Sequence, residues 1–185
     1  MSQPEQTYSR LGGVFHVVHE RGGSKLADFY APNGVTSEGL VAMWNVATGS
    51  PIKGSPAQWY LGVLQKLTVN PALQWAVSWA TIQSGAGRWS PVSTQLGWGG
   101  LLDPITFDAP INGTTLASVV MQTITSSTAG SPPFIEGLFI TNAPNTSVSS
   151  AVLWCTAPVT LTSLSSGDVL TISYTLTTSI GTEGL

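Results

Sequence analysis

Charged side chains are scarce in this chain of 185 residues. Six Lys or Arg and nine Asp or Glu make up 8% of the sequence, where about a quarter is usual for soluble domains. Ser and Thr together number 44, so hydroxyl groups supply most of the polar side chains. A surface with so few charges is poorly protected against association. We therefore expect partner subunits to cover much of this surface.

Basic residues are especially few in the later part of the chain. The net charge is -3, and Arg88 is the only Lys or Arg after Lys66. Binding to nucleic acid needs clustered basic side chains that neutralise phosphates. The sequence holds no such cluster, so we expect no nucleic-acid partner.

Cysteine and long apolar runs are also lacking. Cys155 is the only cysteine, which excludes an intrachain disulfide and fits assembly in a reducing cytoplasm. Residues 1–10 contain Glu5 and no apolar core, and no window approaches the roughly 18 apolar residues of a membrane span. We expect a protein without a signal peptide and without a membrane partner.

The clearest element that is present is a strand near the C-terminal end. Apolar residues alternate with hydroxyl residues there: Leu170, Ile172, Tyr174 and Leu176 against Thr171, Ser173, Thr175 and Thr177. This period of two is typical of a half-buried antiparallel strand. The turn residues 165–168 precede it and predict a hairpin with residues 159–164.

The hydroxyl face of this strand is our candidate subunit contact. A neighbouring subunit can cover Thr171, Ser173 and Thr175 without burying an unpaired charge, because each hydroxyl both donates and accepts hydrogen bonds.

Further strands and two helices are predicted along the chain. The other strands are expected at residues 13–20, 25–30, 58–64, 104–109, 114–125, 134–141 and 151–156. The stretch 114–125 is apolar on both faces, which favours a central position in the sheet. Thr36 is suited to N-cap a helix of about three turns. The face that this helix packs onto the sheet is expected to comprise Leu40, Met43, Trp44 and Ala47.

A second helix is predicted to begin at Pro71, where the missing N–H of proline does no harm. Together the elements predict a mainly β fold, an antiparallel β-sandwich with one or two short helices in the N-terminal half. We expect a flexible N-terminal arm at residues 1–10, one β-rich domain at 11–180 and a tail at 181–185.

Three stretches in this order resemble a family of tailed-bacteriophage virion structural proteins. They are residues 33–40 (NGVTSEGL), 59–64 (WYLGVL) and 166–176 (SGDVLTISYTL). The resemblance covers most of the chain, although the region 75–103 is richer in tryptophan than the family pattern. It implies a role in the head, in the collar or as a tail decoration, in a virion assembled in the host cytoplasm, without a known chemistry.

Few residues could bind a metal or act in catalysis, and their spacing does not suit either role. His16 and His19 would point to opposite faces of a strand and could not both bind one metal. Asp103 and Asp108 would lie roughly 16 Å apart across a short strand, too far for a pair of glycosidase carboxylates, although Glu136 could approach either one. Cys155 has no base nearby in the sequence. We expect no cofactor, no metal and no catalytic residues.

Tryptophan is the one abundant residue with binding potential, with seven in the chain. Exposed indoles stack on sugars or fill pockets on a partner. Our candidate partner or glycan contacts are Trp75, Trp79, Trp89 and Trp98. The default for large aromatic side chains in a protein this low in charge is, however, the core or a subunit interface.

The sequence thus predicts a non-enzymatic virion structural protein that assembles with itself, as a trimer or larger symmetric ring, and with neighbouring virion proteins. The alternative is a receptor- or carbohydrate-binding module of a phage fibre, with host surface glycan as its partner.

Overall fold

The computed structural model describes residues 6–48, 58–66, 78–84, 89–91, 103–108, 114–124, 135–145, 148, 150–161, 164–165 and 167–183. Two helices and nine strands lie within these residues. In chain order they are β1 (Gln6–Arg21), β2 (Ser24–Val35), α1 (Ser37–Thr48), β3 (Trp59–Lys66), α2 (Trp79–Ser84), β4 (Trp89–Pro91), β5 (Asp103–Ile105), β6 (Thr114–Ile124), β7 (Ile135–Thr141), β8 (Leu153–Leu161) and β9 (Asp168–Glu183).

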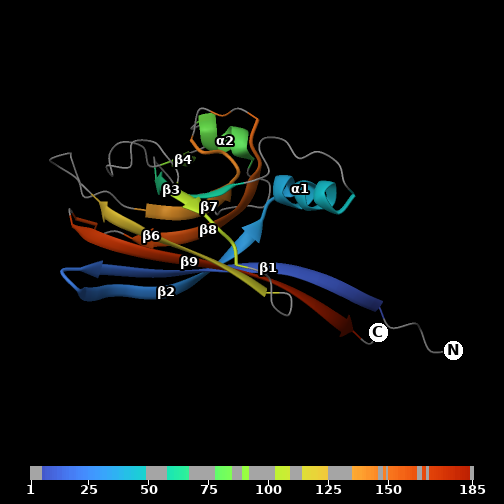
Figure 1. The fold of residues 1–185 in the computed structure, drawn as a ribbon, viewed down its shortest axis with the longest axis horizontal. Coiled ribbons are helices and arrows are strands. Elements are labelled where there is room, and N and C mark those ends of the chain that lie inside the picture. The colour runs from blue at the N-terminus through green and yellow to red at the C-terminus, as the bar shows by residue number, and fades with distance from the viewer. Residues whose placement is uncertain are drawn as a thin grey trace.

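Strand β2 joins two halves of one antiparallel sheet. The strand order is β4-β3-β7-β8-β2-β1-β9-β6, and β5 also pairs with β3. Residues 24–33 of β2 run beside β1, whereas β2 pairs with β8 only at Gly34 and Val35. The sheet curls at this point, and Figure 1 shows β1, β2 and β9 forming a layer below β3, β7 and β8.

The main core lies between these two layers. Its buried apolar side chains come from β1, β2 and β9 on one side and from β3, β7 and β8 on the other. A second cluster places Trp79 and Ile82 of α2 against Phe139 of β7. The layer that contains β7 is therefore covered on both faces, which explains why almost every residue of β7 is buried.

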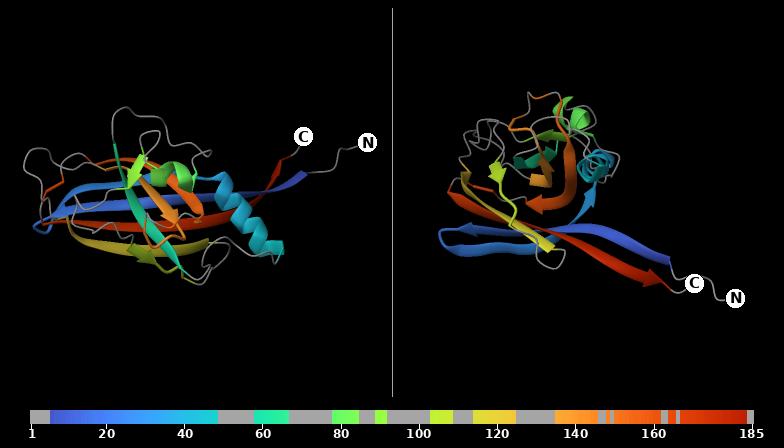
Figure 2. Two further views of the ribbon diagram at one scale, coloured as in Figure 1. Left: turned by 90° about the horizontal axis from the view of Figure 1, so that it is seen from above. Right: turned by 45° about the vertical axis from the view of Figure 1, so that its right-hand side comes forward.

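Strands β1 and β9 form the longest pair of the fold. They are in register over their full length, from Gln6 opposite Glu183 to Arg21 opposite Asp168. Pairing of β1 with β2 stops at Gly13, and pairing of β6 with β9 stops at Thr177. Beyond these points, residues 6–11 and 178–183 form a two-stranded extension that we call the terminal ribbon. It projects from the body in both views of Figure 2.

Helix α1 begins where the sequence predicts and is anchored to β8. The backbone N–H of Gly39 donates to Thr36 Oγ1 at 3.0 Å, which is the N-cap hydrogen bond. Thr36 also donates through its backbone N–H to Trp154 O at 3.0 Å and through its hydroxyl to Leu153 O. Glu38 accepts from the backbone N–H groups of Trp79 and Leu153. These bonds tie α1, α2 and β8 together.

The predicted fold class is confirmed: the protein is mainly antiparallel β with two helices, both in the N-terminal half. The described strands form one curled sheet, joined through β2. The strands predicted at residues 13–20 and 25–30 are also confirmed, and they pair as the hairpin β1–β2, with a turn at Gly22 and Gly23 that have positive φ angles.

Several finer predictions about strands were wrong. β9 pairs with β1 and β6 instead of forming a hairpin with residues 159–164. Residues 159–161 continue the strand that begins at Leu153, so β8 takes in parts of two predicted strands. β6 ends the strand order, although its apolar sequence favoured a central position. Residues 6–10 of the expected arm belong to β1 and residues 181–183 of the expected tail to β9, whereas residues 1–5 and 184–185 lie outside the described part.

The predicted packing face of α1 was wrong for two of its four residues: Met43 packs against the main core as expected, and the side chain of Ala47 is outside the described part. Leu40 and Trp44 are exposed, whereas Gly39 and Ala42 face the body of the protein. A Cβ at Gly39 would lie 2.3 Å from Trp154 O, so the absence of a side chain there lets the helix approach β8 closely. A second helix was predicted to begin at Pro71. The structure has α2 at Trp79–Ser84, and residues 71–77 lie outside the described part.

Candidate functional site: an aromatic pocket and an apolar helix face

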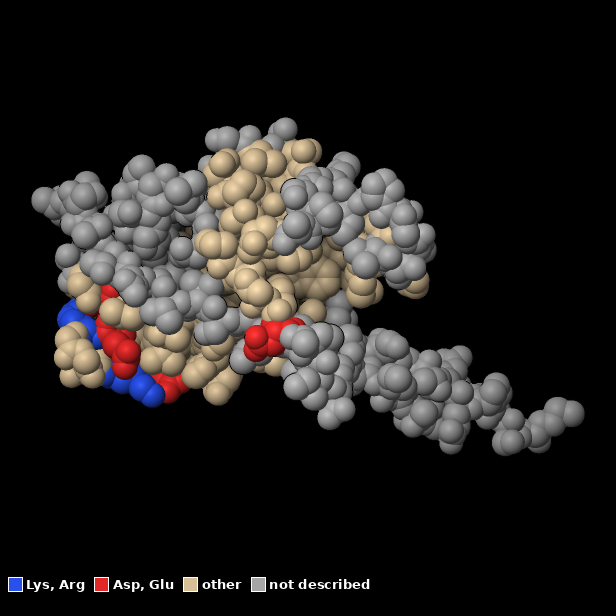
Figure 3. Space-filling model, viewed as in Figure 1, with Lys and Arg blue, Asp and Glu red and all other residues tan. Residues whose placement is uncertain are grey.

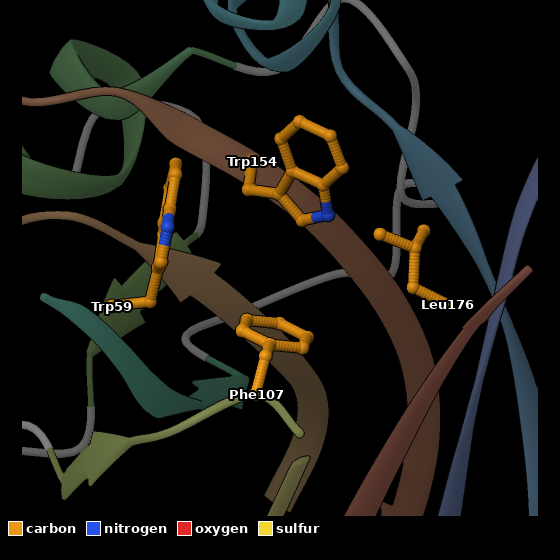
Figure 4. Close-up of a pocket in the computed structure, with 4 residues that line it drawn as sticks. All are labelled: Trp59, Phe107, Trp154 and Leu176. Atoms are coloured by element: carbon orange, nitrogen blue, oxygen red, sulfur yellow. The ribbon is translucent and has the colours of Figure 1, made fainter. Parts of the chain in front are cut away.

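An aromatic pocket opens between the two layers of the sheet. Trp59, Phe107, Trp154 and Leu176 line a cavity of about 160 Å³. The rings of Trp59 and Trp154 meet edge to face, with centroids 5.8 Å apart. Figure 4 shows the four side chains converging on one space from separate parts of the chain.

A buried hydroxyl group holds one wall of this pocket in place. Tyr174 Oη accepts hydrogen bonds from Trp154 Nε1 at 3.3 Å and from Asn33 Nδ2 at 3.1 Å. Burial raises the pKa of Tyr174 above its usual range, and burial raises the pKa of the Cys155 thiol to about 12. Both groups are neutral at physiological pH. Tyr174 orients Trp154 through this hydrogen bond, and neither group is activated as a nucleophile.

The pocket is suited to an uncharged, apolar group. Three of its lining side chains are aromatic and the fourth is Leu176. An apolar cavity of about 150 Å³ accommodates one benzene-sized ring. These four side chains can therefore hold a single ring or a branched alkyl group, and they offer no acid, base or nucleophile to it.

Helix α1 presents a second apolar surface, on the outside of the molecule. Leu40 is 39% exposed, Val41 is 57% exposed and Trp44 is 65% exposed. We call these three residues the α1 face. One of them, Val41, also lines a groove of about 260 Å³ between α1 and residues 151–152. Large apolar side chains grouped on a surface mark interaction sites in many proteins.

The described Lys and Arg side chains, with several acidic ones, lie at the other end of the molecule. Figure 3 shows the visible Lys and Arg side chains beside acidic ones at the tip of the β1–β2 hairpin. There His16 Nε2 lies 2.7 Å from Asp28 Oδ1, and Lys25 Nζ donates to Asp28 Oδ2 at 2.7 Å. The ring of His16 also stacks on Tyr30. These groups form an exposed network of ion pairs on one sheet face.

A buried carboxylate lies on the opposite face near the same tip. Asp168 is fully buried and accepts from Arg21 Nε at 2.6 Å and from the Ser165 N–H at 2.9 Å. His19 Nε2 lies 2.6 Å from its other oxygen. Hydrogen bonding from the Arg21 guanidinium holds the pKa of Asp168 well below its usual range. This cluster, which we call the Asp168 pin, joins β1, β9 and the turn before β9.

The tryptophans predicted as contacts fall in different places. Trp79 is 1% exposed and donates from Nε1 to Val148 O at 2.7 Å, so it belongs to the core and cannot stack on a glycan. Trp89 lies in β4, and its side chain is outside the described part. Trp75 and Trp98 are also outside it. The two pocket tryptophans, Trp59 and Trp154, were not singled out, because no local spacing indicates that residues 95 positions apart meet.

The predicted subunit contact strand has the expected alternation. Leu170, Ile172 and Tyr174 are buried, and Thr171, Ser173 and Thr175 are half-buried on the other face of β9. Whether a subunit covers that face stays a prediction.

The other candidate polar residues do not form a common site within the described residues. His16 and His19 bond different carboxylates on opposite faces. The parts of the chain that the structure describes contain no group of three potential metal ligands. Asp108 is exposed and Glu136 is half-buried on β7, while the side chain of Asp103 is not described.

Comparisons with protein-family models, with curated proteins and with solved structures find no match to this chain. Among the described helices, none has the length and apolar character needed to cross a membrane.

Proposed function

We propose that this protein is a non-enzymatic structural subunit of a bacteriophage virion that assembles with itself and with neighbouring virion proteins at the head, collar or tail. The virion assignment rests on the resemblance of three sequence stretches to that family. The assembly role is supported by the structure independently of that resemblance.

The α1 face is the observation that carries the assembly role. Leu40, Val41 and Trp44 are among the largest exposed apolar side chains of the described residues, and they lie together on one helix. Both Figure 1 and Figure 2 place α1 at the end of the molecule opposite the charged hairpin tip. Burying such side chains against a partner is favourable by about 25 cal/mol per Å² of apolar surface removed from water.

Light scattering of two matched lysine variants tests this role. Val41 is 57% exposed on α1 and Leu26 is 50% exposed near the hairpin tip. We expect Val41→Lys to reduce the mass of the assembled protein, because a charge then enters the buried contact, and Leu26→Lys to leave it unchanged. A wild-type protein that stays monomeric at every concentration contradicts the assembly role.

The virion assignment has a separate test. Purified virions of the source phage, treated with a cross-linker and digested, should give peptides of this chain linked to themselves and to other virion proteins. Absence of the chain from intact virions contradicts the assignment while leaving self-assembly open.

A second candidate function is a receptor- or carbohydrate-binding module of a phage fibre. The aromatic pocket favours it, because Trp59, Phe107 and Trp154 offer ring surfaces to a ligand. Titration of host surface polysaccharide should then protect tryptophan fluorescence from acrylamide. Leu176→Phe should abolish that protection by filling the pocket, and Leu26→Phe should not. Protection that appears only on self-assembly contradicts this candidate.

A further inference from the structure

The terminal ribbon differs from every other part of the described sheet. Residues 6–11 pair only with residues 178–183, and no other described strand pairs with either segment. An isolated pair of antiparallel strands is marginally stable in water, and three or more strands are needed for independent stability. The ribbon of six register pairs, roughly 20 Å long, is therefore an incomplete piece of sheet.

Proline protects the other open edges of the sheet. Four prolines lie in the described strands, at Pro32, Pro91, Pro104 and Pro158. Each stands where its strand has one neighbour: β4 and β5 pair only with β3, and at Pro32 and Pro158 the strands β2 and β8 have diverged. Because proline has no N–H, an incoming strand finds a gap in the ladder there.

The ribbon has no such protection. Residues 6–11 and 178–183 contain neither proline nor lysine, and their only charged residues are Arg10 on β1 and Glu183 on β9. The remaining one-sided strand, β6, also lacks proline, but β5 lies against it. The ribbon thus presents two unprotected edges that carry charges of opposite sign.

The register shows which backbone groups of the ribbon point outward. Pro32 lies opposite Val14 and has no N–H, so we take this pair as non-hydrogen-bonded, with Val14 directed toward β9. The two-residue turn at Gly22 and Gly23 agrees, because it makes Arg21 and Ser24 a hydrogen-bonded pair. Odd-numbered residues of β1 then face away from β9. In the ribbon the outward N–H groups belong to Thr7, Ser9, Leu11, Thr178, Ile180 and Thr182.

We propose that the terminal ribbon is the site at which a second copy of this chain adds by strand pairing, with the β1 edge of one copy against the β9 edge of the next. This inference rests on the proposed self-assembly and adds to it a strand-pairing contact that is separate from the α1 face. Head-to-tail addition places the strand of Arg10 beside the strand of Glu183, whereas pairing of two β1 edges brings two arginines together. An interface between two different edges closes into a ring or continues as a filament.

Two proline variants and their mixture, all carrying Val41→Lys to remove the α1 contact, test the proposal. Ser9 and Ile180 lie opposite each other in the middle of the ribbon, and both direct their N–H groups outward. Ser9→Pro removes a donor from the β1 edge, and Ile180→Pro removes one from the β9 edge. We expect each variant alone to have the mass of one chain, and an equimolar mixture to form a dimer through the two intact edges. The double variant should stay monomeric in any mixture.

Pairing through two like edges, assembly through another surface and absence of assembly would each give a different set of masses in the same experiment. A Ser9→Pro protein that dimerises alone contradicts head-to-tail addition, because it pairs through two like edges. Proline variants that assemble as the Val41→Lys protein does contradict the ribbon contact but leave the proposed function intact. A wild-type protein that is monomeric at all concentrations contradicts both.

Hydrogen exchange of the wild type gives an answer that does not depend on the folding of any variant. The outward amides of Ser9 and Ile180 should become protected as the concentration rises through the assembly range. The inward amides of Tyr8 and Gly181 already have partners within the ribbon and serve as the internal reference. Equal protection of Ser9 and Ile180 in monomer and assembly overturns the proposal.

Discussion

The two ends of the β1–β9 pair are built in opposite ways. At one end Arg21 lies opposite Asp168, and a buried carboxylate with three hydrogen-bonding neighbours fixes both strands and the preceding turn. At the other end Gln6 lies opposite Glu183 in a ribbon that no third described strand supports. The same two strands are thus internally complete at one end and open at the other. Electrostatic stabilisation is thus concentrated at the Asp168 end, whereas the ribbon carries only Arg10 and Glu183 as charged residues.

Removing the carboxylate of the Asp168 pin should cause the largest loss of stability among the changes at the two ends of the β1–β9 pair. Taking one partner out of a fully buried ion pair costs about 3–5 kcal/mol. The Arg21 side chain is 43% exposed, so water can solvate its charge when Asp168 is removed. We therefore expect Asp168→Asn to lower the free energy of unfolding in urea by less than this amount, mainly through the lost hydrogen bonds of the buried carboxylate. Asp28→Asn removes an exposed carboxylate on the other sheet face and is the matched control. An equal loss in both variants would show that the pin has no special role.

The pH dependence of stability should report the same group. The pKa of Asp168 is lowered by hydrogen bonding from Arg21, so its folded-state pKa lies below the unfolded value of about 3.9. The ionised group therefore contributes stability above about pH 4, and that contribution is lost as the pH falls below it. Urea unfolding between pH 7 and pH 2 should show this decline in the wild type. The decline should be smaller in Asp168→Asn.

Adding a methyl group at Gly39 of α1 should have an intermediate effect on the stability of the fold. A Cβ at Gly39 would lie 2.3 Å from Trp154 O, so Gly39→Ala must push α1 away from β8. We expect a loss of about 1–3 kcal/mol in unfolding free energy, even though alanine favours a helix by about 1 kcal/mol. Gly34→Ala is the control, since no atom lies within 4 Å of a Cβ there. Equal stability of the two variants would contradict the close packing of α1.

The smallest free energy is expected for local opening of the terminal ribbon in the monomer at low concentration. Local opening free energies range from about zero at fraying termini to the global value in the core. We expect the Tyr8 and Gly181 amides to exchange through opening that costs little. The Val17 amide, close to the pin and flanked by β2 and β9, should exchange only near global unfolding. Native-state hydrogen exchange at several urea concentrations measures the difference.

Local sequence signals predicted where the strands and helices lie better than they predicted which strands pair with each other. Alternation of Leu170 to Thr177 identified β9, because the period of a strand depends only on which face is buried. The turn before β9 suggested pairing with the preceding strand, yet Asp168 bonds Arg21 and His19, about 150 positions earlier. Such long-range charge pairing leaves no local pattern.

The α1 face and the aromatic pocket also depend on contacts between distant parts of the chain, which local sequence patterns do not reveal. Leu40 and Trp44 have the spacing of a packed helix face, but Gly39 and Ala42 allow closer approach and take the inner side. Trp59 and Trp154 meet because β3 and β8 flank β7, a topology that residue type does not reveal. The tryptophans that the sequence did single out include Trp79, whose depth in the core depends on the same arrangement.

The pairing of β1 with β9 also has a consequence for synthesis on the ribosome. β9 follows every other described element in the chain, so β1 and β2 emerge long before the strand that completes the ribbon. Contacts of such high sequence separation form late in folding, since loop-closure entropy must be overcome first. A nascent or prematurely terminated chain lacking β9 has only one of the two edges that the proposed contact needs. Dependence of the contact on the last strand would act as a checkpoint that admits only finished chains to assembly.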